Sequence, residues 1–354
     1  MLQKVVLMGL VLLSRSISAA QEQSEYAGDL QLEDVAFLNT YGESRLLTKE
    51  QFDGYSASVS VSYRPESEGY FGVERSKDGR LFSTYFQKSS AQKPAGLVVM
   101  FAGFTGNPQD MGAYASKVLP THDGLIIGAP WDQVPYAQDK PGGNIDGGCL
   151  GRMLGGSIFA RQIGYFASYA TVCAGGIGQR IKNEPVDDIL TLLHNEQPLY
   201  VEKKDADGSI DIIEVQPKSY KYWAAIGQCY GGALALKMHK ELVQKTGRGF
   251  GAVVVDSPQD EFFNSVEDIK PLQQAGTPVN ILVIKGGQDK SCTEASVIKL
   301  LGASSYASKA VFFKPYNHIS TIYNGRSSER KIRGGRDVLG GIIQEFLTET
   351  NPLS

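Results

Sequence analysis

The chain has 354 residues, enough for one large domain or for one domain with a small appendage. Charged residues make up 21% of it and hydrophobic residues 42%, which is typical of a soluble globular protein. The net charge of −3 excludes the basic excess that marks a nucleic-acid-binding protein or an anionic-membrane-binding protein, so we expect neither partner.

The N-terminus carries a sustained apolar run at residues 5–13, which follows Lys4 and leads to Ser18-Ala19-Ala20. A basic start, a short apolar stretch and a small-residue exit predict a signal peptide over residues 1–20, cleaved before Gln21. The run is too short to span a bilayer, so we expect a secreted protein with no membrane span after cleavage. An uncleaved anchor is the alternative.

Residues 21–90 are predicted to form an N-terminal extension with antiparallel lead-in strands. Residues 55–63 alternate with period two, with serines on one side and Tyr, Ala and Val on the other, which predicts a strand. Residues 80–86 are also strand-like, and Lys77-Asp78-Gly79 supplies a turn before them.

Residues 91–350 are predicted to form the main domain. Its expected strands are apolar and lie at residues 96–101, 125–129, 222–226, 252–256, 279–284 and 310–313. Helical patterns are found between and after them, at residues 111–118, 186–193, 233–238 and 335–348. Apolar strands separated by helices predict an α/β fold with a doubly wound, mostly parallel sheet covered on both faces.

Two segments interrupt this alternation. Residues 133–180 combine many glycines with aromatic residues, which favours an inserted cap or a substrate-binding loop. A plain packed helix at about residues 157–172 is the alternative. Residues 199–216 predict a hairpin with its turn at 205–209. That turn is acidic, but its glycine stands four positions from Asp205 rather than six, so it lacks the spacing of an EF-hand calcium loop.

The most informative motif lies at residues 222–232, where an apolar strand ends in Gly-x-Cys-x-Gly-Gly and a helix follows. This is the layout of a nucleophile elbow, with Cys229 at the tip in place of the usual serine. Side chains two positions to either side of the tip would meet neighbouring backbone, which accounts for Gly227 and Gly231. The following helix places its positive end beside the tip and favours a thiolate. A buried structural cysteine at an ordinary turn is the alternative.

A thiol nucleophile needs a base, and the base needs an orienting acid. His318 follows the strand at 310–313, and Asp289 follows the strand at 279–284. Nucleophile, acid and then histidine is the chain order of α/β-hydrolases. Asp289 could instead cap a helix, His318 could be a loop residue without a role, and Asp256 is the alternative acid.

An oxyanion hole needs two backbone amides beside the nucleophile. One is expected from Tyr230, directly after Cys229. The other is expected from Phe104, in the glycine-containing turn at residues 101–106 after an early strand. An ordinary strand-to-helix turn explains the same glycines.

If the protein is exported, its four cysteines are candidates for disulfide bonds, because disulfides form in oxidising compartments. Cys149 and Cys173 flank one glycine-rich segment and could close it. A disulfide between Cys229 and Cys292 would instead leave the elbow without a free nucleophile. The sequence has no zinc-site spacing and no CxxC pair, so we expect no metal and no cofactor.

Over roughly residues 91–350 the chain resembles the α/β-hydrolase superfamily, and its elbow resembles the dienelactone hydrolase group, which carries Gly-x-Cys-x-Gly-Gly with Asp and His downstream. The resemblance implies Cys229 as nucleophile, Asp289 as acid and His318 as base. The signal peptide and the two insertions depart from that group. So does Ala102-Gly103, where many α/β-hydrolases have His-Gly. The fold transfers to this chain and the dienelactone substrate does not.

The sequence therefore predicts a secreted hydrolase acting on a small-molecule ester, lactone or related acyl substrate. The alternatives are a non-catalytic binding protein of the same fold and an acyltransferase.

Overall fold

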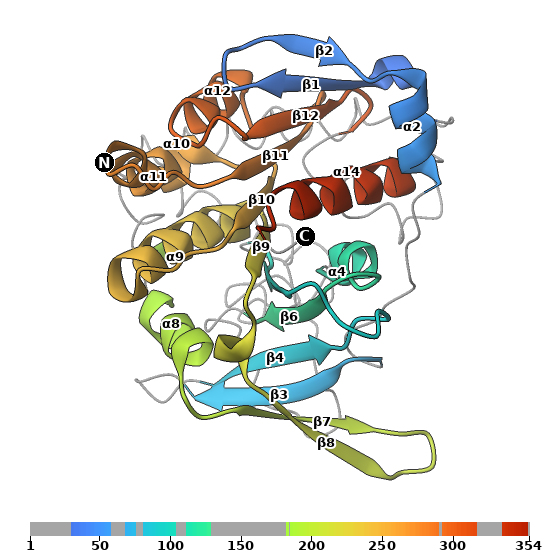
Figure 1. Ribbon diagram of the computed structural model, residues 1–354, viewed down its shortest axis with the longest axis vertical. Coiled ribbons are helices and arrows are strands. Elements are labelled where there is room, and N and C mark those ends of the chain that lie inside the picture. The colour runs from blue at the N-terminus through green and yellow to red at the C-terminus, as the bar shows by residue number, and fades with distance from the viewer. Residues whose placement is uncertain are drawn as a thin grey trace, which may run out of the picture.

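The computed structural model describes residues 30–57, 68–75, 81–103, 111–128, 182–183, 185–289, 292–316 and 335–352. These residues form a twelve-stranded sheet with helices on both faces (Figure 1). The strands are β1 (Val35–Asn39), β2 (Ser44–Leu46), β3 (Tyr70–Arg75), β4 (Leu81–Gln87), β5 (Leu97–Phe101), β6 (Asp123–Ile127), β7 (Leu199–Lys204), β8 (Ile210–Val215), β9 (Trp223–Gln228), β10 (Ala252–Asp256), β11 (Ile281–Gly286) and β12 (Lys309–Phe313). The helices are η1 (Leu32–Asp34), α2 (Lys49–Ser56), α4 (Gly112–Val118), α8 (Val186–His194), η3 (Pro217–Ser219), α9 (Tyr230–Thr246), α10 (Asp260–Phe263), α11 (Ser265–Gln274), α12 (Glu294–Gly302) and α14 (Gly335–Glu349).

The sheet has the order β2-β1-β12-β11-β10-β9-β5-β6-β4-β3-β7-β8. Every pair from β12 across to β6 is parallel, whereas the strands outside this block pair antiparallel. Within the parallel block, the chain adds β6 on one side of β5 and then crosses to the other side to add β9, β10, β11 and β12 in turn. Strand β9 therefore lies inside the block, next to the point where the direction of strand addition reverses. The predicted α/β fold is confirmed, and the sheet is mixed: its central block is parallel and its two flanks are antiparallel.

Alternate residues of the parallel strands face opposite layers of helices, as the two-residue period of a strand requires. On one face, Val99, Ala225 and Val283 pack in a core with α8, α9, α11 and α12. On the other face, Val98, Ala224 and Leu282 pack in a core with α4 and α14. Figure 1 shows the two helical layers on either side of the sheet. Burial on both faces explains why these strands are apolar at every position.

In the N-terminal region one predicted strand is replaced by a helix. The predicted strand at residues 55–63 is wrong at its start, because Tyr55 lies in helix α2 and Ala57 ends that helix. Thr48 caps α2, and its side chain accepts from the amide of Gln51 while the Gln51 side chain reaches back to the Thr48 amide. This capping box decides for helix over the period-two pattern. Residues 58–63 lie outside the described residues.

Strands β1 and β3 were not predicted from the sequence, whereas the strand predicted at 80–86 is confirmed as β4. β1 pairs antiparallel with β12, and β3 and β4 form an antiparallel hairpin beside β6. The N-terminal extension therefore contributes strands to both sides of the parallel block.

The predicted hairpin at residues 199–216 is confirmed as β7 and β8, which form one edge of the sheet. Gly208 turns the chain with φ of 87°, and its amide donates to the Asp205 carbonyl over 3.0 Å. Residues 1–20, the segment 133–180 and its Cys149 and Cys173 lie outside the described residues. No helix within the described ranges is long and apolar enough to cross a membrane.

Candidate active site

The elbow forms where β9 ends and α9 begins. Cys229 stands alone between Gln228, the last residue of the strand, and Tyr230, the first residue of the helix. Its φ is 53° and its ψ is −116°, a conformation that costs a non-glycine residue about 1–3 kcal/mol. The Cys229 amide donates to the Asp256 carbonyl over 2.8 Å, and its carbonyl accepts from the Gly232 amide over 3.1 Å. Neighbouring backbone thus holds the strained residue in place.

The two glycines flanking Cys229 are required by close backbone contacts. A Cβ on Gly227 would collide with the carbonyl group of Gly231, and a Cβ on Gly231 would collide with the carbonyl oxygens of Phe101 and Ala102. Strand, helix and the end of β5 therefore touch through bare backbone at this point. This is the geometry of a nucleophile elbow at the centre of a doubly wound sheet.

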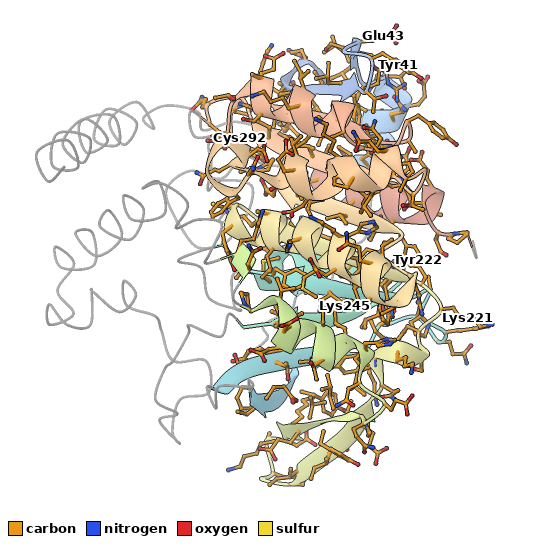
Figure 2. The ribbon with its side chains drawn as sticks, turned by 90° about the vertical axis from the view of Figure 1, so that its left-hand side faces the viewer. Tyr41, Glu43, Lys221, Tyr222, Lys245 and Cys292 are labelled. Atoms are coloured by element: carbon orange, nitrogen blue, oxygen red, sulfur yellow. The ribbon has the colours of Figure 1, made fainter. Side chains whose placement is uncertain are left out.

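The strand order and the elbow together have the layout of the α/β-hydrolase fold expected from the sequence. In such a sheet, ligands bind outside the carboxyl ends of the strands, where the strand order reverses. Cys229 occupies that place in this sheet. Figure 2 labels a residue near each end of the parallel strands: Cys292, which follows β11, lies toward the left, and Tyr222, which precedes β9, lies on the right.

Cys229 is a free thiol and is partly buried. Because its sulfur is unbonded, the Cys229–Cys292 disulfide considered from the sequence is not formed between these two described residues. The Sγ atom lies 3.5 Å from Oε1 of Gln259 and donates to it. The thiol is therefore available for chemistry and already has a hydrogen-bond partner.

The loop that carries Asp289 is joined directly to the segment that leads to His318. The Gly287 amide donates to the Phe313 carbonyl over 2.7 Å, and the Gln288 amide donates to the Tyr316 carbonyl over 2.8 Å. A Cβ on Gly287 would press on the backbone of Lys314. Asp289 directly follows one of these bonded residues. His318 follows Tyr316 by two positions and lies outside the described residues.

Asp289 is buried, and its Oδ1 accepts from the Cys292 amide over 3.1 Å. The helix that follows is capped by another residue, because the Thr293 side chain accepts from the Ser296 amide at the start of α12. Asp289 therefore is not the cap of α12, and its own bond to the Cys292 amide is a contact within the turn that precedes the helix.

Asp256, the alternative acid, has a different environment. It is fully buried at the end of β10, where Tyr114 of α4 and the Ser257 hydroxyl, at 2.9 Å, donate to its two carboxylate oxygens. Two hydroxyl donors stabilise a buried carboxylate within the core. Asp256 also supports the elbow through its main chain, since its carbonyl accepts from the Cys229 amide.

Of the two residues expected to form the oxyanion hole, Tyr230 lies within the described residues. Tyr230 opens α9, and the first amides of a helix point out of its N-terminal end. The turn after β5 lies beside it, since the Phe101 and Ala102 carbonyls face Gly231, and a Cβ on Gly103 would collide with Oε1 of Gln228. Phe104 itself lies outside the described residues.

Gln259 is a site residue that was not predicted from the sequence. It follows β10, occupies the N-cap position of α10 and is only 3% exposed. Phe263, at the other end of α10, packs edge-on against the Tyr230 ring with centroids 5.5 Å apart. Nothing in the local sequence marks Gln259, because its contact with Cys229 joins residues 30 positions apart.

In the part of the chain that the structure describes, no three His, Cys, Asp or Glu side chains gather in a way that could hold a metal ion. Histidines 122 and 239 are buried away from the elbow, His122 beside the Tyr222 ring and His239 beside Phe250. Burial lowers the pKa of each imidazole to about 4. Both rings are therefore neutral at pH 7.

No family model and no curated protein matches the chain. Among solved structures, a putative dienelactone hydrolase from Klebsiella pneumoniae is similar at 13% identity and TM-score 0.40, covering 78% of this chain and 98% of its own. An esterase from Thermogutta terrifontis shows 13% identity and TM-score 0.43, covering 80% and 92% respectively. A dienelactone hydrolase-like phosphotriesterase from metagenomic libraries shows 15% and 0.44, covering 78% and 98%. At such values the fold assignment depends on the strand order and the elbow.

Proposed function

We propose that this chain is a hydrolase of esters or related acyl compounds, with Cys229 as nucleophile, His318 as base and Asp289 as orienting acid. The observation that carries the proposal is the elbow: a free thiol at φ of 53°, held between bare backbone contacts at the centre of the sheet. Strain of this kind persists only where the surrounding structure imposes it, and it gathers at functional sites.

The triad partners are supported by how the two loops meet. The Gln288 amide donates to the carbonyl of Tyr316, two positions before His318, and this bond supports the choice of His318 as the partner of Asp289. Asp256 is the weaker candidate, because Tyr114 and Ser257 already donate to its carboxylate. Asp289 accepts a main-chain amide and lies on the loop bonded to the histidine's own segment.

The proposed reaction has two halves. The Cys229 thiol gives its proton to His318 as its sulfur attacks the carbonyl carbon, and the amides of Tyr230 and Phe104 bind the oxyanion. The leaving alcohol takes the proton from His318, and a thioester on Cys229 remains. Water then attacks this thioester with His318 as base, which releases the acid and restores the thiol.

The neighbours' names agree with this class of reaction, since they include an esterase and dienelactone hydrolase-like proteins. The proposal includes export, which depends on the N-terminal apolar run. A non-catalytic binding protein is disfavoured by the free Cys229 thiol. Acyl transfer to an acceptor other than water uses the same first half and differs only in the second.

Turnover of a small aryl ester by purified variants tests the proposal. Cys229→Ala is expected to abolish turnover and Asp289→Asn to lower kcat about 10²-fold or more, since the amide keeps an acceptor for Cys292 but lacks the charge. Asp256→Asn is the matched control and is expected to stay within about tenfold of the wild type, with a loss of stability instead. Turnover that survives Cys229→Ala would rule out the assignment.

A further inference from the structure

The short helix α10 forms a wall beside the nucleophile, and Gln259 at its start is the residue that meets the thiol. A glutamine that is 3% exposed has lost its contact with water, so burying its amide must be offset by hydrogen bonds. One of these is the Cys229 S–H donating to its Oε1 over 3.5 Å, within the range for a sulfur donor. This contact joins the end of β9 to the segment between β10 and α10.

The main chain around Gln259 is fixed from both sides. Before it, Ser257 takes a left-handed φ of 52°, and its amide donates to the Ile284 carbonyl of β11 over 2.8 Å. After it, the Gln259 carbonyl accepts from the Phe263 amide over 3.3 Å, which closes the single turn of α10. These main-chain bonds fix the turn that carries Gln259, and the turn places the Gln259 side-chain amide beside the Cys229 thiol.

The far end of α10 is anchored by a buried cation. Lys182 is fully buried, and its Nζ donates to the Phe263 carbonyl and to Oδ2 of Asp268 at 2.5 Å. Burial lowers the pKa of Lys182, and the Asp268 carboxylate opposes that shift. Phe263 also packs on Tyr230, the first residue after the nucleophile. Both ends of α10 are therefore tied to the site.

We propose that Gln259 is a positioning residue that holds the Cys229 side chain in one orientation through its S–H and that must release it before the thiolate forms. A carbonyl oxygen accepts only from the neutral thiol, so the bond is lost on deprotonation. The proposal rests on the proposed function only in taking Cys229 as the nucleophile.

The test is the pH dependence of Cys229 alkylation by iodoacetamide, read residue by residue with mass spectrometry so that the other cysteines do not contribute. Gln259→Glu places a negative charge at the sulfur and is expected to raise the pH of half-maximal rate by about one unit or more. Gln259→Ala admits water, which also donates to a thiolate, and is expected to lower that pH and to increase the rate at pH 7 about threefold or more.

Gln288→Glu is the control, since it adds the same charge on an exposed residue of the same edge of the sheet. It is expected to leave the midpoint nearly unchanged. Charged groups on neighbouring elements include Asp256 on β10, Asp260 on α10 and Asp289 after β11, and all three are unchanged in these variants.

Opposite shifts for the two Gln259 variants support the proposal. Unchanged midpoints, or a shift in Gln288→Glu as large as in Gln259→Glu, would overturn it. If either variant fails to fold, Gln259→Asn withdraws the acceptor by one methylene and is expected to shift the midpoint in the same direction as Gln259→Ala. Alkylation requires no turnover, so loss of the proposed esterase activity and loss of the Gln259 effect are separate results.

Discussion

The strain at Cys229 predicts an inverted order of stability between alanine and glycine at this position. Both Cys229→Ala and Cys229→Gly remove the sulfur, so they differ only in the Cβ atom. At φ of 53° a Cβ costs about 1–3 kcal/mol. Glycine loses about 0.5–1 kcal/mol more chain entropy on folding. The balance leaves Cys229→Gly more stable than Cys229→Ala by about 1 kcal/mol.

Urea unfolding at pH 7 measures this difference through the transition midpoint at constant slope. Ala233 provides the control because it lies on the first turn of α9, just after the elbow, and is buried in ordinary helical conformation. There Ala233→Gly is expected to lose about 1–2 kcal/mol through helix propensity and the lost methyl group. If Cys229→Ala proves as stable as Cys229→Gly or more so, the residue is unstrained and the elbow geometry is wrong.

Three further predictions concern stability. Gly231→Ala is expected to cost more than about 3 kcal/mol or to prevent folding, because its Cβ meets carbonyl oxygens, whereas Gly302→Ala, which opens into free space, should be nearly neutral in the same urea assay. Lys182→Met is expected to cost about 2 kcal/mol, because it removes the buried donor to the Phe263 carbonyl while Asp268 keeps Lys240 and Lys237 nearby; a loss under 1 kcal/mol by calorimetry would mean that the α10 anchor is unimportant. Histidines 122 and 239 have pKa values lowered to about 4, so the unfolded chain binds their protons first as the pH falls below about 6.5. Stability is therefore fully present above pH 6.5 and is lost toward pH 4, by about 2 kcal/mol for each ring at pH 5, and a double variant with both rings replaced by Gln should show a flatter pH profile.

The parallel part of the fold could be predicted because each strand is buried on both faces. Strands β5, β9, β10 and β11 are fully buried along their length, so each appears in the sequence as an apolar run with few alternatives. The elbow was predictable for a related reason. Gly227 and Gly231 are set by backbone contacts that allow no side chain, and such contacts leave a fixed spacing in the sequence.

The N-terminal region was predicted less well because its signals compete. The alternation at residues 55–63 favours a strand, but Thr48 and Gln51 form a capping box that starts α2 before it. That capping signal is present in the sequence and carries more weight than a period-two pattern of serines. Strand β1 is marked only weakly, because its place depends on pairing with β12 far along the chain.

The candidate site was predictable where it follows strand ends and not where it depends on tertiary contacts. Asp289 could be placed from its position after β11, and the bond between Gln288 and Tyr316 joins its loop to the segment that precedes His318, which itself lies outside the described residues. Gln259 could not be found in this way. Its burial and its contact with Cys229 arise only when β10 and α10 pack beside β9.

The central claim is that Cys229 carries the acyl group during turnover. Mass spectrometry after rapid acid quench of the protein with an aryl acetate tests it directly, since acid preserves a thioester and stops its hydrolysis. We expect one acetyl group on the peptide that contains Cys229, accumulating further in His318→Ala if deacylation becomes slower than acylation, and absent in Cys229→Ala. Acetylation of another residue, or steady ester hydrolysis by Cys229→Ala, would contradict it.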